Sequence, residues 1–118
     1  MARAKITDEV GGTAVRSALA EDADRNTTAT AVRYLLQLLA ERAPGNTVEV
    51  RVPPFGAVQC IPGPRHTRGT PPNVIETDAA TWLALASGSL SWPDALASGS
   101  VHASGQRATL GGLLPLRF

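Results

Sequence analysis

Nucleophilic catalysis would require a thiol or hydroxyl beside an imidazole, and the sequence offers few residues with that chemistry. The chain has one cysteine, Cys60, and two histidines, His66 and His102, and it contains no Gly-x-Ser-x-Gly nucleophile elbow. Cys60 lies in the most apolar stretch of the chain, where a buried thiol stays protonated and inert. We therefore expect a structural role for Cys60, no catalytic residue and no enzymatic activity.

Metal and phosphate sites are equally weakly indicated. A single cysteine excludes a multi-cysteine metal site and an intramolecular disulfide, and the spacing of the histidines matches no ligand pattern. Gly11 and Gly12 precede a helical stretch, but no Gly-x-Gly-x-x-Gly motif or Walker lysine accompanies them. We expect neither a metal nor a cofactor.

The stretch from Arg65 to Asn73, with the sequence RHTRGTPPN, is the one place where anion contact is plausible. Arg65, His66 and Arg68 fall within four positions, and two guanidiniums and an imidazole can face one carboxylate or phosphate. The alternative is that the arginines are solvated while the two prolines fix the entry into the next strand. These three residues are candidates for contact with an anion or a protein partner.

Composition limits the class of protein. The chain has 118 residues, 43% of them hydrophobic, and its 11 basic against 10 acidic residues leave a net charge of +1. This describes one globular domain with no electrostatic case for nucleic acid or an anionic membrane. The run from Leu35 to Ala40 is far shorter than the roughly 20 residues of a membrane span. Because no apolar stretch follows Arg3 and Lys5, we expect no signal peptide and a cytoplasmic location.

Periodicity predicts four helices. The strongest signal is at Thr28–Ala43, with apolar residues at i, i+3, i+4 and i+7 and a cap at Thr27 or Thr28. Arg33, Gln37 and Glu41 form its opposite, polar stripe. The other helices are a weaker one at Val10–Ala20, one at Ala79–Ser87 capped by Asp78 and ended by Gly88, and one from Ser91 to Gly99.

Four strands are predicted between and after these helices, and they define the fold class. Val48–Val52 alternates apolar and polar residues, and Phe55–Ile61 can pair with it antiparallel across two prolines. Val74–Thr77 and Ser100–Ser104 are shorter. Strands and helices do not alternate strictly, which favours an α+β fold with helices on one face of a small sheet. The leucine-rich tail at 108–116 would cover the core edge, line a cavity or contact a partner.

Two long segments resemble the bacterial branch of the sterol carrier protein family. They are VEVRVPPFGAVQCIPGPRHTRGTPPNVIETD at 48–78 and TWLALASGSLSWPDALASGSVHASGQRATLGGLLPL at 81–116. The helix AVRYLLQLLAERAPG at 31–45 fits this branch too. We therefore expect a variable N-terminal segment at 1–25 and a sterol-carrier-like domain at 26–118.

The resemblance implies a sheet of about five strands, helices on one side and an apolar cavity between them. Better-known relatives carry sterols, fatty acids or acyl-CoA there, which requires no catalytic residue. The function expected from the resemblance is non-catalytic binding or carriage of a lipid or other apolar small molecule, without nucleic acid and without integral membrane association. The residue pattern alone favours a packing role for Trp82, whereas the resemblance places it in the cavity wall. The candidate cavity lining implied by the resemblance is Leu36, Leu39, Phe55, Val58, Trp82, Leu85 and Leu113.

The resemblance also supplies an alternative. Domains of this type occur attached to thiol-dependent isomerase-like proteins, and longer relatives end in a closing helix that this chain lacks after Leu116. The alternative is an accessory or interaction domain whose cavity is filled by side chains and whose Arg65–Asn73 loop docks a partner or an anionic ligand.

Overall fold

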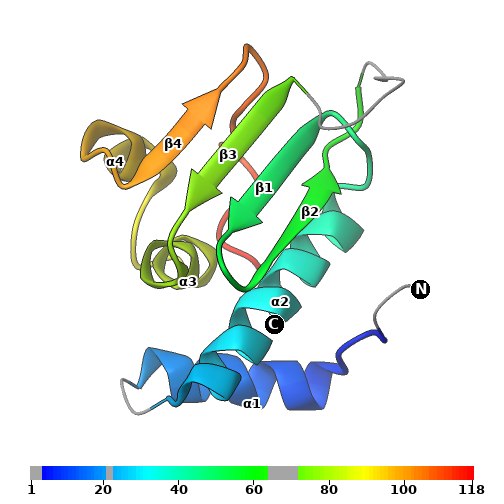
Figure 1. Cartoon of the computed structure of the whole chain (residues 1–118), viewed down its shortest axis with the longest axis vertical. Coiled ribbons are helices and arrows are strands. Elements are labelled where there is room, and N and C mark those ends of the chain that lie inside the picture. The colour runs from blue at the N-terminus through cyan, green and yellow to red at the C-terminus, as the bar shows by residue number, and fades with distance from the viewer. Residues whose placement is uncertain (1–3, 21–22, 64–71) are drawn as a thin grey trace.

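A mixed four-stranded sheet with helices on one face organises the chain in the computed structural model (Figure 1), which describes residues 4–20, 23–63 and 72–118. The elements, in chain order, are α1 (Asp8–Leu19), α2 (Arg25–Arg42), β1 (Val48–Val52), β2 (Gly56–Cys60), β3 (Asn73–Thr77), α3 (Ala79–Ser87), α4 (Trp92–Ala97) and β4 (Val101–Ser104). The predicted α+β class is confirmed.

The strands are ordered β2-β1-β3-β4, so β2 and β4 form the two edges of the sheet. β1 pairs antiparallel with β2, which confirms the predicted pairing across the prolines, and parallel with β3. β3 pairs antiparallel with β4. The sheet therefore has four strands in the described part of the chain, which is close to the expected number of about five but one fewer.

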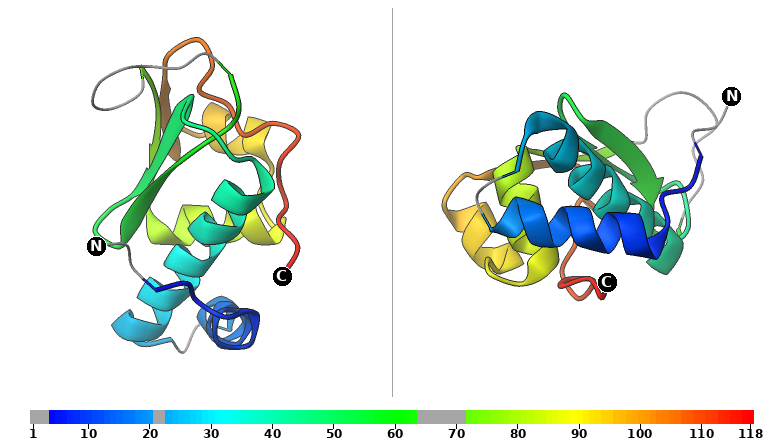
Figure 2. Two further views of the ribbon diagram at one scale, coloured as in Figure 1. Left: turned by 90° about the vertical axis from the view of Figure 1, so that its right-hand side faces the viewer. Right: turned by 90° about the horizontal axis from the view of Figure 1, so that it is seen from below.

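The C-terminal tail shows why no fifth strand forms there. Residues 108–118 run as turns and irregular chain on the helical side of the sheet (Figure 2). Gly112 has a φ of 85°, and proline at 115 has no N–H to donate to a ladder. The main-chain N–H of Leu116 instead donates to the carbonyl oxygen of Ala86 in α3 at 2.9 Å. The tail covers the core edge, one of the three roles considered for it.

The helix ends follow capping chemistry. Asp78 caps α3 by accepting from the N–H of Thr81 at 2.7 Å, and Gly88 ends that helix at a φ of 93°. Ser91 caps α4. The cap predicted at Thr27 or Thr28 was wrong, because Asp24 starts α2 and accepts from the N–H of Thr27 at 2.7 Å. The carboxylate at position 24 is an equally good cap three residues earlier, and it lengthens the helix accordingly.

Helix α1 packs directly on α2. Gly11 and Gly12 are both buried, and a Cβ built on Gly11 would overlap the ring of Tyr34. The Tyr34 hydroxyl donates to the Asp8 carboxylate at 2.7 Å. A residue without a side chain therefore lets the two helices approach closely, and one polar contact secures the pair.

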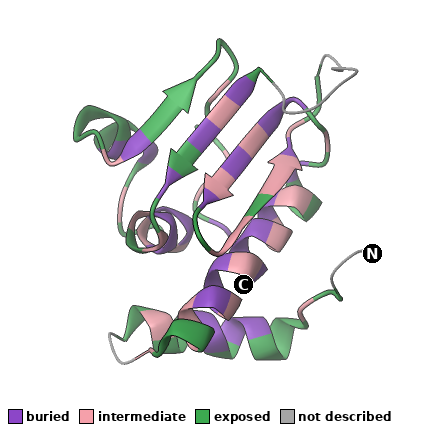
Figure 3. Cartoon of the chain, viewed as in Figure 1, coloured by how far each residue is buried: buried purple, intermediate pink, exposed green. Residues whose placement is uncertain are grey.

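The core fills the layer between the sheet and the helices (Figures 2 and 3). The alternating buried residues of β1 face α2 and α3, and the leucines predicted at helical spacing on α2 are all at most 1% exposed. This face of the sheet is thus closed, whereas the opposite face carries the partly exposed polar residues.

Candidate binding grooves

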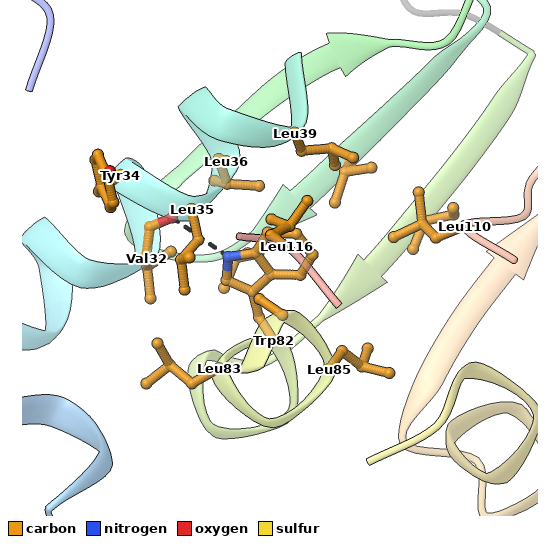
Figure 4. Packing of buried hydrophobic residues seen from close by; sticks show 14 of the residues in the cluster. Val32, Tyr34, Leu35, Leu36, Leu39, Trp82, Leu83, Leu85, Leu110 and Leu116 are labelled. Atoms are coloured by element: carbon orange, nitrogen blue, oxygen red, sulfur yellow. Dashed lines mark hydrogen bonds between the residues drawn. The ribbon is translucent and has the colours of Figure 1, made fainter. Parts of the chain in front are cut away.

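Side chains occupy the space between α2, the sheet and α3, where the sequence placed a ligand cavity. Trp82 is fully buried at the centre of this layer, and its indole Nε1 donates to the main-chain oxygen of Val32 at 3.3 Å (Figure 4). Leu36, Leu39 and Leu85 around it are at most 1% exposed. A charged side chain at position 82 would therefore disrupt the core itself.

Two surface grooves flank this filled core, one on each side. The first, which we call the strap groove, lies between α2, the start of β2 and the extended residues 4–6, and has a volume of about 350 Å³. It is lined by Ala4, Ile6, Arg33, Leu36, Gln37, Phe55, Gly56, Ala57 and Val58. Leu36, Phe55 and Val58 from the predicted lining thus come together here.

Residues 4–6 form a strap along the groove, and α2 holds this strap by its polar stripe. The side-chain oxygen of Gln37 accepts from the N–H of Ile6 at 2.9 Å, and its amide nitrogen donates to the oxygen of Ile6 at 2.9 Å. Lys5 forms an ion pair with Glu41 at 3.0 Å, which raises the lysine pKa through the hydrogen bond and charge of Glu41. The strap is thereby fixed at two successive residues.

Arginine side chains define the polar border of the strap groove. The Nε of Arg33 donates to the main-chain oxygen of Phe55 at 2.8 Å. This hydrogen bond holds the guanidinium at the end of the connection between β1 and β2. The guanidinium carbon of Arg25 lies 5.4 Å from the centre of the Phe55 ring, within range of a cation–π interaction. The groove therefore combines an apolar wall with positive charge at one end.

The second groove, the tail groove, lies between the C-terminal tail and the α3–α4 connection, and its volume is about 360 Å³. Its lining is Leu85, Gly88, Leu90, Ser91, Trp92, Pro93, Leu110, Gly111, Gly112, Leu114 and Pro115. Leu85 of the predicted lining belongs here. Leu113 packs, partly buried, against the core in the same tail. Among the residues that the structure describes, no ionisable side chain lines this groove.

Cys60 and His102, two of the residues considered for catalysis, lie apart from both grooves. Cys60 is fully buried at the end of β2, and this burial raises the pKa of its thiol to about 11. His102 is exposed on β4, at the opposite edge of the sheet. In residues 4–20, 23–63 and 72–118, no three His, Cys, Asp or Glu side chains gather closely enough to hold a metal ion. The candidate anion contacts Arg65, His66 and Arg68 lie outside the described residues.

Sequence reasoning missed the second half of the strap groove. Arg33, Gln37 and Glu41 were recognised as a polar stripe, but the stripe pattern alone did not show that the strap binds to it. Gly56 gave the clearest available signal, because glycine inside a strand often marks a close approach by another group. A Cβ at Gly56 would lie 3.5 Å from Leu36 and 3.6 Å from Arg33, so the missing side chain opens the groove.

The comparisons with known proteins establish the family. Residues 24–116 match the family model described as bacterial SCP ortholog, and the chain belongs to this bacterial branch of sterol carrier proteins. The match begins at the N-cap of α2, so the strap and α1 precede it. No curated protein is a significant match. Within the described part of the chain, no helix has the length and apolar character to cross a bilayer.

Proposed function

We propose that the protein binds and carries an apolar small molecule or lipid chain in the strap groove and catalyses no reaction on it. The observation that carries this proposal is the convergence of Leu36, Phe55 and Val58 on one groove beside a strap fixed by Gln37. Membership of a carrier family supports the class of function. The cytoplasmic location expected from the sequence is part of the same proposal.

The dimensions of the groove suit a short or partly inserted chain. Its volume of about 350 Å³ lies at the lower end of ligand pockets, which typically span about 300–1,000 Å³. Each buried methylene contributes about 0.8 kcal/mol, and micromolar affinity requires about 8 kcal/mol net. Association and ordering costs must be met as well. Micromolar binding then requires that more than about ten methylenes of the ligand are buried, or that the strap moves so that more of the chain is covered.

The chemistry of the groove lining supports a carrier rather than an enzyme. Among the described residues, its polar side chains are an arginine and a glutamine, and both already hold main-chain groups of the protein. Neither is a nucleophile or a general base at neutral pH. The buried thiol of Cys60, with its raised pKa, is equally unsuited to nucleophilic attack.

Two glycine substitutions test which groove binds the ligand. Gly56→Val would fill the strap groove, because a Cβ there meets only ordinary contacts and the residue lies in a strand that favours valine. Gly111→Val is the matched control, since it projects toward Trp92 in the tail groove, with its Cβ 3.3 Å from the Thr109 hydroxyl oxygen. Native mass spectrometry on detergent-free protein and titration with a brominated fatty acid would measure binding.

We expect the wild type and Gly111→Val to bind the probe and Gly56→Val to lose binding by tenfold or more. A brominated chain in the tail groove would quench the fluorescence of Trp92. If the quenching is unchanged in Trp92→Phe, it arises at the remaining tryptophan, Trp82, and supports the strap groove. Binding that survives Gly56→Val but fails in Gly111→Val would assign the ligand to the tail groove and contradict the proposed site. Absence of binding in all three proteins would overturn the carrier function and favour the alternative of an interaction domain. An Arg65→Ala/Arg68→Ala variant would then test whether the Arg65–Asn73 loop docks a partner or an anionic ligand.

A further inference from the structure

Strand β4 is an edge strand whose side chains are largely exposed (Figure 3). His102, Ala103 and Ser104 are all exposed, and only Val101 is buried, at 5% exposure. In the described residues β3 is its one strand neighbour, so main-chain donors and acceptors along its outer side are not part of the sheet ladder. Such groups are a template for one more extended strand.

One open, shallow hollow borders β4. A hollow of about 570 Å³ is lined by Val74, Glu76, Leu96, Val101, His102, Ala103 and Ser104. On the open face of the sheet, His102 lies opposite Glu76 and Ser104 opposite Val74. On the helical side, Ala103 lies opposite the buried Ile75, and Leu96 of α4 is 43% exposed. An added strand would place its side chains alternately into these two surroundings.

The β4 edge lacks most of the usual protection against strand addition. Its four residues, VHAS, include no proline and no Lys, Arg, Asp or Glu, and its register with β3 runs from Val101 to Ser104 without a bulge. The other edge differs, because β2 contacts α2 and borders the strap groove, and two prolines precede it. The two edges lie at opposite sides of the sheet (Figure 1).

We propose that β4 pairs antiparallel with β4 of a second copy of this chain and joins the two sheets into one. The occupant must be extended, apolar on the helical side and polar on the open face, and β4 itself has this pattern. Val101 and Ala103 supply the apolar side, and His102 and Ser104 the polar side. In an antiparallel pair about a two-fold axis, residues of the same side lie opposite each other, so the strand is complementary to itself.

This pairing leaves ligand binding unaffected. The strap groove borders β2, and the dimer forms at β4 on the other edge of the sheet. Leu96 of each copy would be covered together with the apolar strip, which accounts for an exposed leucine beside an edge strand.

Sedimentation equilibrium and hydrogen exchange of the full chain test the proposal. We expect a reversible dimer within concentrations up to about 1 mM, which includes weak association. Amide exchange at 101–104 should slow as the dimer forms. Ala103→Glu places like charges across the two-fold axis at an exposed position and should weaken dimerisation at least tenfold, whereas Ala57→Glu, an exposed position on β2, should not.

His102→Glu, on the other side of the same strand, is a second variant that should also weaken dimerisation. Circular dichroism shows whether each variant is folded. A monomer throughout the concentration range would overturn the proposal. A dimer that is lost in Ala57→Glu and kept in Ala103→Glu would assign the interface to β2. A dimer without concentration-dependent protection of 101–104 would place the contact elsewhere and also overturn it.

Discussion

The side-chain amide of Gln37 makes both of its hydrogen bonds to the main chain of Ile6, each at 2.9 Å, and so ties the chain before α1 to the middle of α2. The glutamine amide both accepts from and donates to the main chain of Ile6, as the backbone of a neighbouring strand would. Because residues on both sides of this contact line the strap groove, its geometry connects the N-terminal segment with the proposed binding site.

Gln37→Ala should release the strap. The variant loses two hydrogen bonds that are partly buried, each worth about 1 kcal/mol. Exchange of the Ile6 amide should become at least about tenfold faster by local opening, while the unfolding midpoint falls slightly. Gln59→Ala is the control, because Gln59 bonds only to the exposed side chain of Asn46 at 2.8 Å in the described structure. Equal exchange of the Ile6 amide in wild type and Gln37→Ala would contradict the strap contact.

The contact between α1 and α2 predicts opposite outcomes for two adjacent glycines. Gly11→Ala should destabilise the protein by roughly 1–3 kcal/mol, because the new methyl group would overlap the Tyr34 ring and force the helices apart. Gly12→Ala should be stabilising by about 0.5–1 kcal/mol through helix propensity. Its nearest neighbour would be the flexible end of Arg16 at 3.3 Å.

Urea denaturation of both variants measures this difference in the free energy of unfolding. The same substitution in the same helix makes each protein the control for the other. Similar stabilities for Gly11→Ala and Gly12→Ala would show that α1 does not pack closely on Tyr34.

How much of the structure the sequence predicts depends on how far apart in the chain the interacting residues are. Local signals were sufficient for the helix at Ala79–Ser87, where Asp78 and Gly88 lie beside the element they limit. The alternation of valines in β1 likewise predicted its buried face. These features depend on neighbours in sequence, and they were read correctly.

Long-range packing was the part that periodicity could not resolve. A leucine-rich helix and a tryptophan produce the same apolar pattern whether they surround a cavity or fill a core, and only the structure shows Trp82 at the centre of a filled layer. The pairing of Gln37 with Ile6, 31 residues apart, has no counterpart in the local pattern of either segment. The candidate site was therefore only partly predictable, through Leu36, Phe55 and Val58.

Cys60 should react with thiol reagents only after unfolding. The side chain is fully buried, and burial raises its pKa to about 11, so at pH 8 both the access and the thiolate are lacking. Labelling with a chromogenic disulfide should give no signal in the native protein and one equivalent in denaturant, since the chain has one cysteine. Rapid labelling under native conditions, at a rate independent of denaturant, would contradict this burial.

The single tyrosine of the chain gives a direct optical test of the α1–α2 contact. Burial, followed by the hydrogen bond to Asp8, raises the pKa of Tyr34 to about 12 from an ordinary value of 10. The folded protein therefore holds the phenol proton at a pH where the unfolded chain has lost it. Stability from this group is complete below pH 10, falls as the pH rises from 10 toward 12, and is lost above that range.

Absorbance of the phenolate measures this titration. In the native protein the absorbance should rise near pH 12, or abruptly when alkali unfolds the chain, and in denaturant it should rise near pH 10. Asp8→Asn keeps a hydrogen-bond acceptor but removes the negative charge, so it should lower the pKa of Tyr34 only in part, because burial is the larger cause. A native titration near pH 10 without unfolding would mean that the phenol is open to solvent and that α1 does not cover it.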